Sequence, residues 1–181
     1  MRYEEYLQCA EKHLNGCVAL LSSYQANNRF DSQVWLELYY LSGYIVEGIT
    51  IYSAYKLNNW NPNDDIKYRY NLTFTQRTNL DFYYKRNGAP PYYQNRPSGA
   101  LSVQGHKFQD IVKNLLKPNP SFNNVPYLGL GQIDKDVESL IDNWSPNIRY
   151  MHKIINALPV LNKDVMVRLM DTCRNIYYQH I

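Results

Sequence analysis

The chain reads Tyr39-Tyr40-Leu41-Ser42-Gly43-Tyr44-Ile45-Val46-Glu47 in the middle of its most apolar segment, which runs from Val34 to Tyr55. Apolar side chains occur on nearly every side of a helix built from this segment. Asp31 or Ser32 can cap its N-terminus, because short polar side chains accept hydrogen bonds from the first free backbone N–H groups. We therefore expect a helix that continues to about Leu57 and forms the centre of the core.

This segment is about as long as a membrane span, but it contains Glu37 and Glu47. Carboxylates near the middle of a span are costly, so a buried core helix is favoured and no membrane contact is expected. A buried Glu47 needs a partner or a raised pKa. Gly43, which has no side chain, should let another element approach closely.

Helical patterns occur on both sides of the central segment, and each places its apolar residues three and four positions apart. They predict an all-α, up-and-down bundle of four to five main helices in one domain, residues 1–181, with a loop or hairpin region inserted between the second and third helices. The first predicted helix runs from Tyr3 to Tyr24, with Ala10, Leu14 and Val18 on its apolar face. Two more run from Val103 to Leu116 and from Asn147 to about Leu158. A short helix begins at Asp134, with Val137, Leu140, Ile141 and Trp144 on one side, and the last follows Asn162, with Val165, Leu169, Cys173, Ile176 and Tyr177 facing inward.

The insert, at about residues 58–102, is basic and rich in tyrosine. The stretches 67–75 and 80–84 are rich in strand formers, so a small hairpin is one alternative for it. Basic side chains that contact phosphates, interleaved with rings that stack on bases, are typical of single-stranded nucleic acid binding. The competing interpretation is a lid whose tyrosines pack on the helices while its cations are solvated. The candidate nucleic-acid-binding residues are Lys67, Arg69, Tyr70, Tyr84, Lys85 and Arg86.

Composition limits the class of protein. The formal net charge of +3 argues against a general polyanion binder, so any nucleic-acid contact must be local. Three cysteines form no dense, even framework, which indicates reduced thiols in the cytoplasm. The first residues lack the basic start and continuous apolar stretch of a signal peptide, so no export is expected.

The segment from Tyr39 to Glu47 resembles the second helix of HEPN domains, small helical bundles linked with nucleotide and RNA chemistry in prokaryotic toxin–antitoxin and defence systems. Two further pieces fit the family in order, Gly105-His106-Lys107-Phe108 and Trp144-Ser145-Pro146-Asn147-Ile148-Arg149-Tyr150. The resemblance implies that Glu47 lies inside the bundle, where it would meet Arg149 or His106. Many relatives carry a lysine one turn after the glutamate, whereas this chain has Ile51.

Ribonucleases of the family carry an arginine and a histidine four to six residues apart, with a polar residue after the arginine. Arg174-Asn175-Ile176-Tyr177-Tyr178-Gln179-His180 has this form. The resemblance implies that His180 would move the proton of a 2′-hydroxyl while Arg174 holds the phosphate, without a metal. The alternative is an arginine and a histidine on the solvated end of a terminal helix.

Cys9, His13 and Cys17 follow one another at intervals of four and share one helix stripe, a zinc-type set of ligands. Cys9 and Cys17, however, are separated by about 12 Å of helix, which one ion cannot bridge. Small core cysteines beside a histidine are therefore favoured, and we expect no bound metal. No cofactor is expected either, since Gly129-Leu130-Gly131 lacks the third glycine and the preceding strand of a phosphate loop.

These observations favour an accessory module that binds single-stranded RNA or a nucleotide without catalysis, as a homodimer and alongside a partner protein, in a toxin–antitoxin or defence setting. A metal-independent endoribonuclease using Arg174 and His180 is the first alternative. A helical protein-interaction scaffold is the second. Fold resemblance alone does not choose among them, because function is set by the site.

Overall fold

A computed structural model describes residues 2–27, 32–57, 62–63, 82–83, 101–102, 134–151 and 161–179. It confirms the predicted all-α fold. The helices are α1 (Glu4–Asn27), α2 (Ser32–Leu57), α5 (Lys135–Asp142) and α6 (Lys163–Tyr178), with a 3₁₀ helix, η6 (Pro146–Tyr150).

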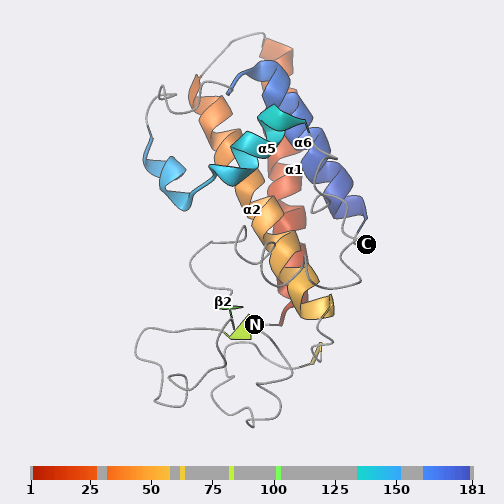
Figure 1. Cartoon of the computed structure of the whole chain (residues 1–181). Helices are drawn as coiled ribbons and strands as arrows, with labels where there is room; N and C mark the ends of the chain where they lie inside the picture. The colour runs from red at the N-terminus through yellow and green to blue at the C-terminus, as the bar shows by residue number, and fades with distance from the viewer. Residues whose placement is uncertain are drawn as a thin grey trace.

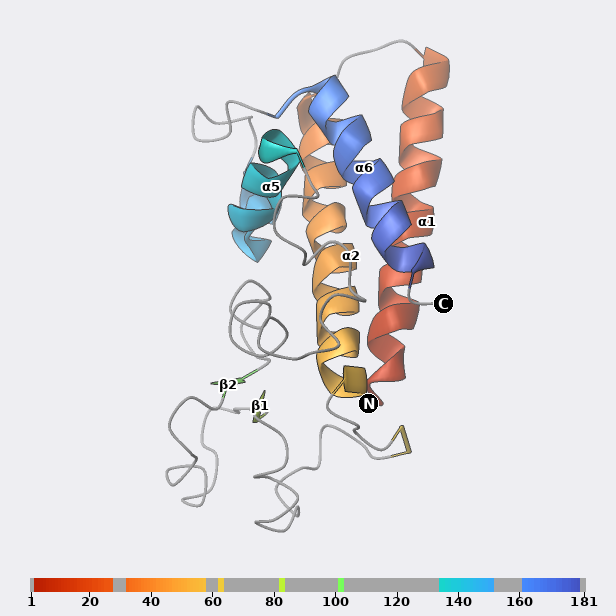
Figure 2. The same cartoon turned by 45° about the vertical axis from the view of Figure 1, so that its right-hand side comes forward.

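The three long helices form one packed unit. α1 and α2 run antiparallel to each other, and α6 lies across both of them in the half of the bundle that contains the start of α2 (Figure 1). α5 packs on α6 and lies on the flank of α2 away from α1, and it reaches α2 through the Tyr39–Leu140 hydrogen bond; η6 follows it along the same flank (Figure 2). α2 therefore lies at the centre of the described helices and packs against α1, α6 and η6.

The α1–α2 contact is close because small residues face each other. Ala10 is fully buried, and a Cβ added at Gly48 would come within 2.7 Å of the backbone oxygen of Tyr6. The predicted inward stripe of α1 is confirmed at Ala10 and Leu14, but the prediction was wrong at Val18, which is 37% exposed. Val18 lies next to the buried Cys17 and so at the edge of the stripe.

α2 is buried along most of its length, as expected from its apolar sequence. Its buried serine and threonine hydroxyls donate to the carbonyl of the preceding turn, which satisfies them within the helix: Ser42 to Tyr39 O, Thr50 to Val46 O and Ser53 to Ile49 O, each at 2.8 Å. Polar residues can therefore occupy this core without partners from other helices. Neither α2 nor any other helix in the described ranges is long and apolar enough to cross a membrane.

The inward faces of the two C-terminal helices match their sequence patterns. All the apolar residues predicted to face inward are buried: Val137, Leu140, Ile141 and Trp144 from the α5 segment, and Val165, Leu169, Cys173, Ile176 and Tyr177 from α6. The predicted starts are also confirmed. Asp134 and Asn162 are the N-cap residues of α5 and α6.

Two details differ from the predictions. Residues 147–158 were predicted to form one helix. At its start the structure has the short 3₁₀ helix η6 instead, which ends because the backbone of Met151 is extended (φ −83°, ψ 124°); residues 152–158 lie outside the described residues. In the insert, β1 (Phe82–Tyr83) pairs in parallel with β2 (Leu101–Ser102), whereas neighbouring strands of a hairpin are antiparallel. The predicted helix at 103–116 lies outside the described residues.

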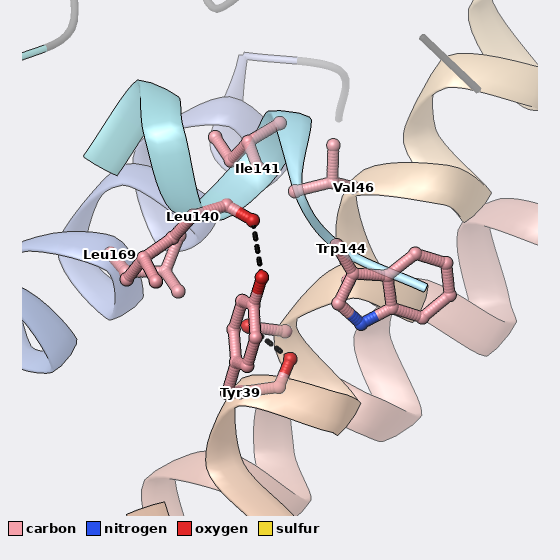
Figure 3. A pocket seen from close by; sticks show the side chains of 8 residues that line it. Tyr39, Val46, Leu140, Ile141, Trp144 and Leu169 are labelled. Atoms are coloured by element: carbon pink, nitrogen blue, oxygen red, sulfur yellow. Dashed lines mark hydrogen bonds between the residues drawn. The ribbon is translucent and has the colours of Figure 1, made fainter. Parts of the chain in front are cut away.

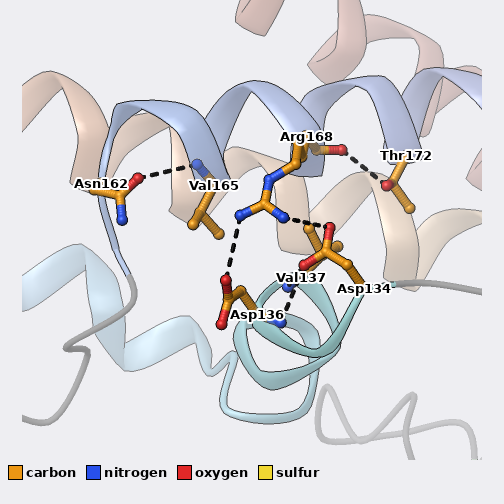
Figure 4. Close-up of polar contacts among 7 residues, drawn as sticks. All are labelled: Asp134, Asp136, Val137, Asn162, Val165, Arg168 and Thr172. Atoms are coloured by element: carbon orange, nitrogen blue, oxygen red, sulfur yellow. Dashed lines mark hydrogen bonds and ion pairs between the residues drawn. The ribbon is translucent and has the colours of Figure 1, made fainter.

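An ion-pair network joins the start of α5 to α6 (Figure 4). Asp134 accepts hydrogen bonds from the backbone N–H groups of Asp136 and Val137, both at 3.1 Å. The guanidinium of Arg168 lies 3.0 Å from the Asp134 carboxylate and 3.2 Å from that of Asp136. Asp134 therefore both caps α5 and orients it against α6.

Replacing Asp134 with alanine is expected to lower the free energy of unfolding by about 1–2 kcal/mol, since it removes the cap and one partner of a partly exposed ion pair. Asp134→Asn is the matched control: its amide oxygen can still cap the helix, so it should lose less than about 1 kcal/mol. Urea unfolding of both variants measures the difference. Equal losses would contradict a capping role.

Candidate functional site

A tight seam fixes the segment after α5 against the middle of α2 (Figure 3). The indole ring of Trp144 lies against Gly43 so closely that a Cβ there would overlap it. The indole Nε1 donates to Tyr40 O at 3.1 Å, and the hydroxyl of Tyr39 donates to Leu140 O at 2.6 Å. The space between these residues is too narrow to admit a water molecule, so the seam is a rigid support rather than a binding cavity.

η6 begins directly after this seam and presents two side chains outward. Ser145 caps it by accepting from the backbone N–H of Asn147 at 3.3 Å, and Pro146 occupies the first turn. Ile148, 2% exposed, anchors the turn in the core. Arg149 and Tyr150 consequently point away from the core: Arg149 is exposed and Tyr150 is 65% exposed.

A surface hollow of about 200 Å³ lies between η6 and the first half of α2. Its lining combines apolar side chains with polar and charged ones: Leu36, Ile148 and Met151, and Gln33, Glu37, Tyr40 and Arg149. The guanidinium of Arg149 lies 4.6 Å from the ring centroid of Tyr150 and within hydrogen-bonding reach of the Tyr40 side chain. Interaction with Tyr150, before any other cause, raises the pKa of Arg149, which remains a permanent cation.

The polar lining from α2 belongs to a stripe along one helix face. Gln33, Glu37, Tyr40, Tyr44 and Glu47 follow one another at alternate spacings of four and three, so their side chains leave the same face. The stripe passes from exposed Gln33 and Glu37 to Glu47, which is 8% exposed. It connects the hollow to the core.

Tyr44 occupies the middle of this stripe. The hydroxyl of Tyr40 donates to that of Tyr44 at 3.3 Å, and the rings of His13 and Trp144 pack on Tyr44 at centroid distances of 5.5 and 5.0 Å. Burial first, then the contact with Tyr40 and the charge of Glu47, raise the pKa of Tyr44, so the phenol stays protonated at neutral pH. Burial also lowers the pKa of His13.

The predicted set of buried polar residues is only partly reproduced. Glu47 is buried, but Arg149 is exposed, so the prediction that buries Arg149 is corrected. The reason is geometric: η6 reaches α2 beside Tyr40, which precedes Glu47 by about 10 Å of helix. No ion pair joins Glu47 to Arg149 in the described part of the chain. His106 lies outside the described residues.

The predicted ribonuclease pair cannot be compared as a pair, because His180 lies outside the described residues. Arg174 lies on α6, and its guanidinium is 3.3 Å from the carboxylate of Asp171 on the same helix. The predicted nucleic-acid-binding residues of the insert, Lys67, Arg69, Tyr70, Tyr84, Lys85 and Arg86, also lie outside the described residues.

The three residues of the zinc-type set have different surroundings. Cys9 is exposed, Cys17 is fully buried and His13 stacks on Tyr44. Burial raises the pKa of Cys17 to about 12, and it also raises the pKa of the buried Cys173, whose thiol donates to Ser42 O at 3.8 Å. Across the described ranges, no three histidine, cysteine or acidic side chains are placed to hold a metal ion.

Sequence reasoning selected Arg149 but missed Gln33, Glu37 and Tyr40 as its neighbours in the hollow. The alternate four-and-three spacing was available as a signal, but it is hidden in a helix that is apolar nearly all round.

Comparison of the chain with family models, curated proteins and solved structures found no match. The function is therefore inferred from the hollow itself.

Proposed function

We propose that this chain is a non-catalytic cytoplasmic module that binds single-stranded RNA or a nucleotide at the hollow between α2 and η6. The observation that carries the proposal is the exposed Arg149 beside Tyr150 and Tyr40. The resemblance to HEPN domains gives the biological setting of the proposal, an accessory protein of a toxin–antitoxin or defence system that acts as a homodimer with a partner protein.

The hollow and the exposed Tyr150 beside it offer contacts for the phosphate, base and sugar of a nucleotide. The guanidinium of Arg149 can donate two parallel hydrogen bonds to a phosphate. Tyr150 lies beside the hollow, next to Arg149, and its exposed ring offers a face on which the neighbouring base of a single strand can stack, an interaction worth about 1–3 kcal/mol per base. The apolar side chains of Leu36 and Met151 can cover the other parts of a base and sugar.

Arg174 is already paired with a carboxylate on its own helix. Asp171 already pairs with this arginine, so a substrate phosphate would have to compete with a carboxylate on the same helix. The endoribonuclease alternative with His180 is tested by incubating wild type and His180→Ala with mixed RNA in EDTA. Cleavage by wild type alone would replace the proposal of a non-catalytic module.

Replacing Arg149 with alanine is expected to weaken binding of single-stranded RNA at least tenfold, because the phosphate contact is lost. The slope of log affinity against log salt should also become shallower by about 0.7, the value for one phosphate contact on a single strand. Filter binding at low and moderate salt measures both quantities. Arg149→Lys should recover only part of the affinity, since lysine lacks the two-pronged geometry.

Lys163→Ala is the matched control, since it removes one exposed positive charge at the start of α6. Its affinity for RNA should remain within about twofold of wild type, because an exposed charge outside the binding site is screened by salt. Equal losses in the two variants would show that binding depends on net charge rather than on the hollow. If wild type binds no RNA and no nucleotide at either salt concentration, the proposal fails, and a stoichiometric protein partner on copurification would favour the scaffold.

A further inference from the structure

We infer that the hollow selects a single guanine nucleotide, with Glu37 on the base and Arg149 on the phosphate. This inference rests on the proposed function and makes it specific to one class of base. The inference follows from the presence of both Glu37 and Arg149 in one hollow. A site that bound only the phosphates of a nucleic acid would gain nothing from the carboxylate.

The order of the side chains along α2 separates the two charges. Arg149 reaches α2 at Tyr40, and Glu37 precedes Tyr40 by one helical turn, with Gln33 a further turn away. Along the helix axis, Tyr40 is therefore about 4.5 Å from Glu37 and about 10 Å from Gln33. One nucleotide that lies along this face places its phosphate at Arg149 and the edge of its base near Glu37.

The size of the hollow favours one base at a time, from a free nucleotide or from a strand. Sites for drug-sized ligands measure about 300–1,000 Å³, whereas this hollow measures about 200 Å³. It can take one base and part of its sugar. A negative charge at Glu37 would also repel a second phosphate on that side, because like charges at close range oppose each other.

The state of Glu37 suits a hydrogen-bond acceptor for a ligand. Its side chain is exposed, and within the described part of the chain it makes no hydrogen bond and no ion pair with Arg149 or another residue. The carboxylate therefore keeps its acceptor positions for a ligand, and the guanidinium is not neutralised by it.

The chemistry of the bases then selects guanine. An ionised carboxylate only accepts hydrogen bonds, and it can accept two in parallel. The Watson–Crick edge of guanine carries two adjacent donors, N1–H and the N2 amino group, which match the two carboxylate oxygens. The same edges of adenine, cytosine and uracil each place an acceptor beside their donor, so the carboxylate would gain one bond and face one repulsion.

The test measures equilibrium binding of the full chain to the 5′-monophosphates of guanosine, adenosine, cytidine and uridine by titration calorimetry. Wild type should bind the guanosine nucleotide about tenfold more tightly than the other three, as expected for one two-point contact with a base. Glu37→Gln should abolish this preference without weakening the uridine nucleotide, a pattern that loss of folding would not produce. Glu138→Gln, an exposed carboxylate on α5, is the matched control and should keep the preference.

Equal affinity for all four nucleotides, or a guanine preference that survives in Glu37→Gln, would overturn the inference and leave the proposed function standing. Absence of binding to any nucleotide and to RNA would overturn both. A uridine-rich oligonucleotide with a single guanine distinguishes the source of the ligand. Tight binding of this strand identifies an RNA guanine, and binding of the free nucleotide alone identifies a small-molecule ligand; both results support guanine selection.

Discussion

Replacing Gly43 with alanine is expected to lower the free energy of unfolding by about 2–3 kcal/mol, although alanine is the better helix former by about 1 kcal/mol. The new methyl group would overlap the indole ring of Trp144, which is 4% exposed and is held by its hydrogen bond to Tyr40 O. The ring cannot move aside without breaking this bond and shifting η6. Urea unfolding measures the loss.

Gly16→Ala is the matched control, because Gly16 is also helical but a Cβ added there meets nothing within 4 Å. It should stabilise the protein by up to about 1 kcal/mol. In a Trp144→Leu background, Gly43→Ala should lose much less stability than in wild type, because the smaller side chain leaves room for the methyl group. Additive effects of the two substitutions would show that the overlap with Trp144 is not the cause.

The packing of Trp144 on Gly43 shows which features of the fold could be predicted from the sequence and which could not. The apolar pattern from Val34 to Tyr55 predicts a buried helix because burial depends mainly on residue type, and the structure confirms it. The role of Gly43 as a close-approach position also follows from its lack of a side chain. The residue that packs against Gly43 could not be predicted, because Trp144 lies 101 residues away in sequence and no local pattern links the two.

The candidate site could be predicted less well, for a similar reason. Arg149 was selected from a resemblance that placed it inside the bundle, but the chain turns at η6 and Met151 in a way that leaves it exposed. An α-helix that starts at Asn147 and a 3₁₀ turn have almost the same local sequence signals, but the side chain of Arg149 points in a different direction in each. Glu37, on the opposite wall of the hollow, becomes a candidate only when η6 is placed against α2.

Alkaline pH is expected to destabilise the fold, beginning near pH 9. Burial raises the pKa of the Cys17 thiol from 9.0 to about 12, and the thiol is fully buried. A group whose pKa is higher in the folded state contributes stability below its unfolded pKa, and that contribution is lost as the pH rises toward the folded pKa. At pH 10.5 the loss from Cys17 alone is about 2 kcal/mol, at roughly 1.4 kcal/mol per pH unit.

Cys173 and Tyr39 should deepen this loss in the same direction, because burial raises the pKa of each and neither side chain is more than 1% exposed. Urea unfolding at pH 8 and pH 10.5 measures the fall in stability. Cys17→Ala will be less stable at pH 8 because it leaves a small cavity, but its fall should be smaller than that of wild type by about 2 kcal/mol. Cys9→Ala, at an exposed position, should fall as much as wild type. An equal fall in Cys17→Ala and wild type would show that ionisation of the Cys17 thiol does not limit the stability of the bundle at high pH, and would leave the effect to other buried groups such as Cys173 and Tyr39.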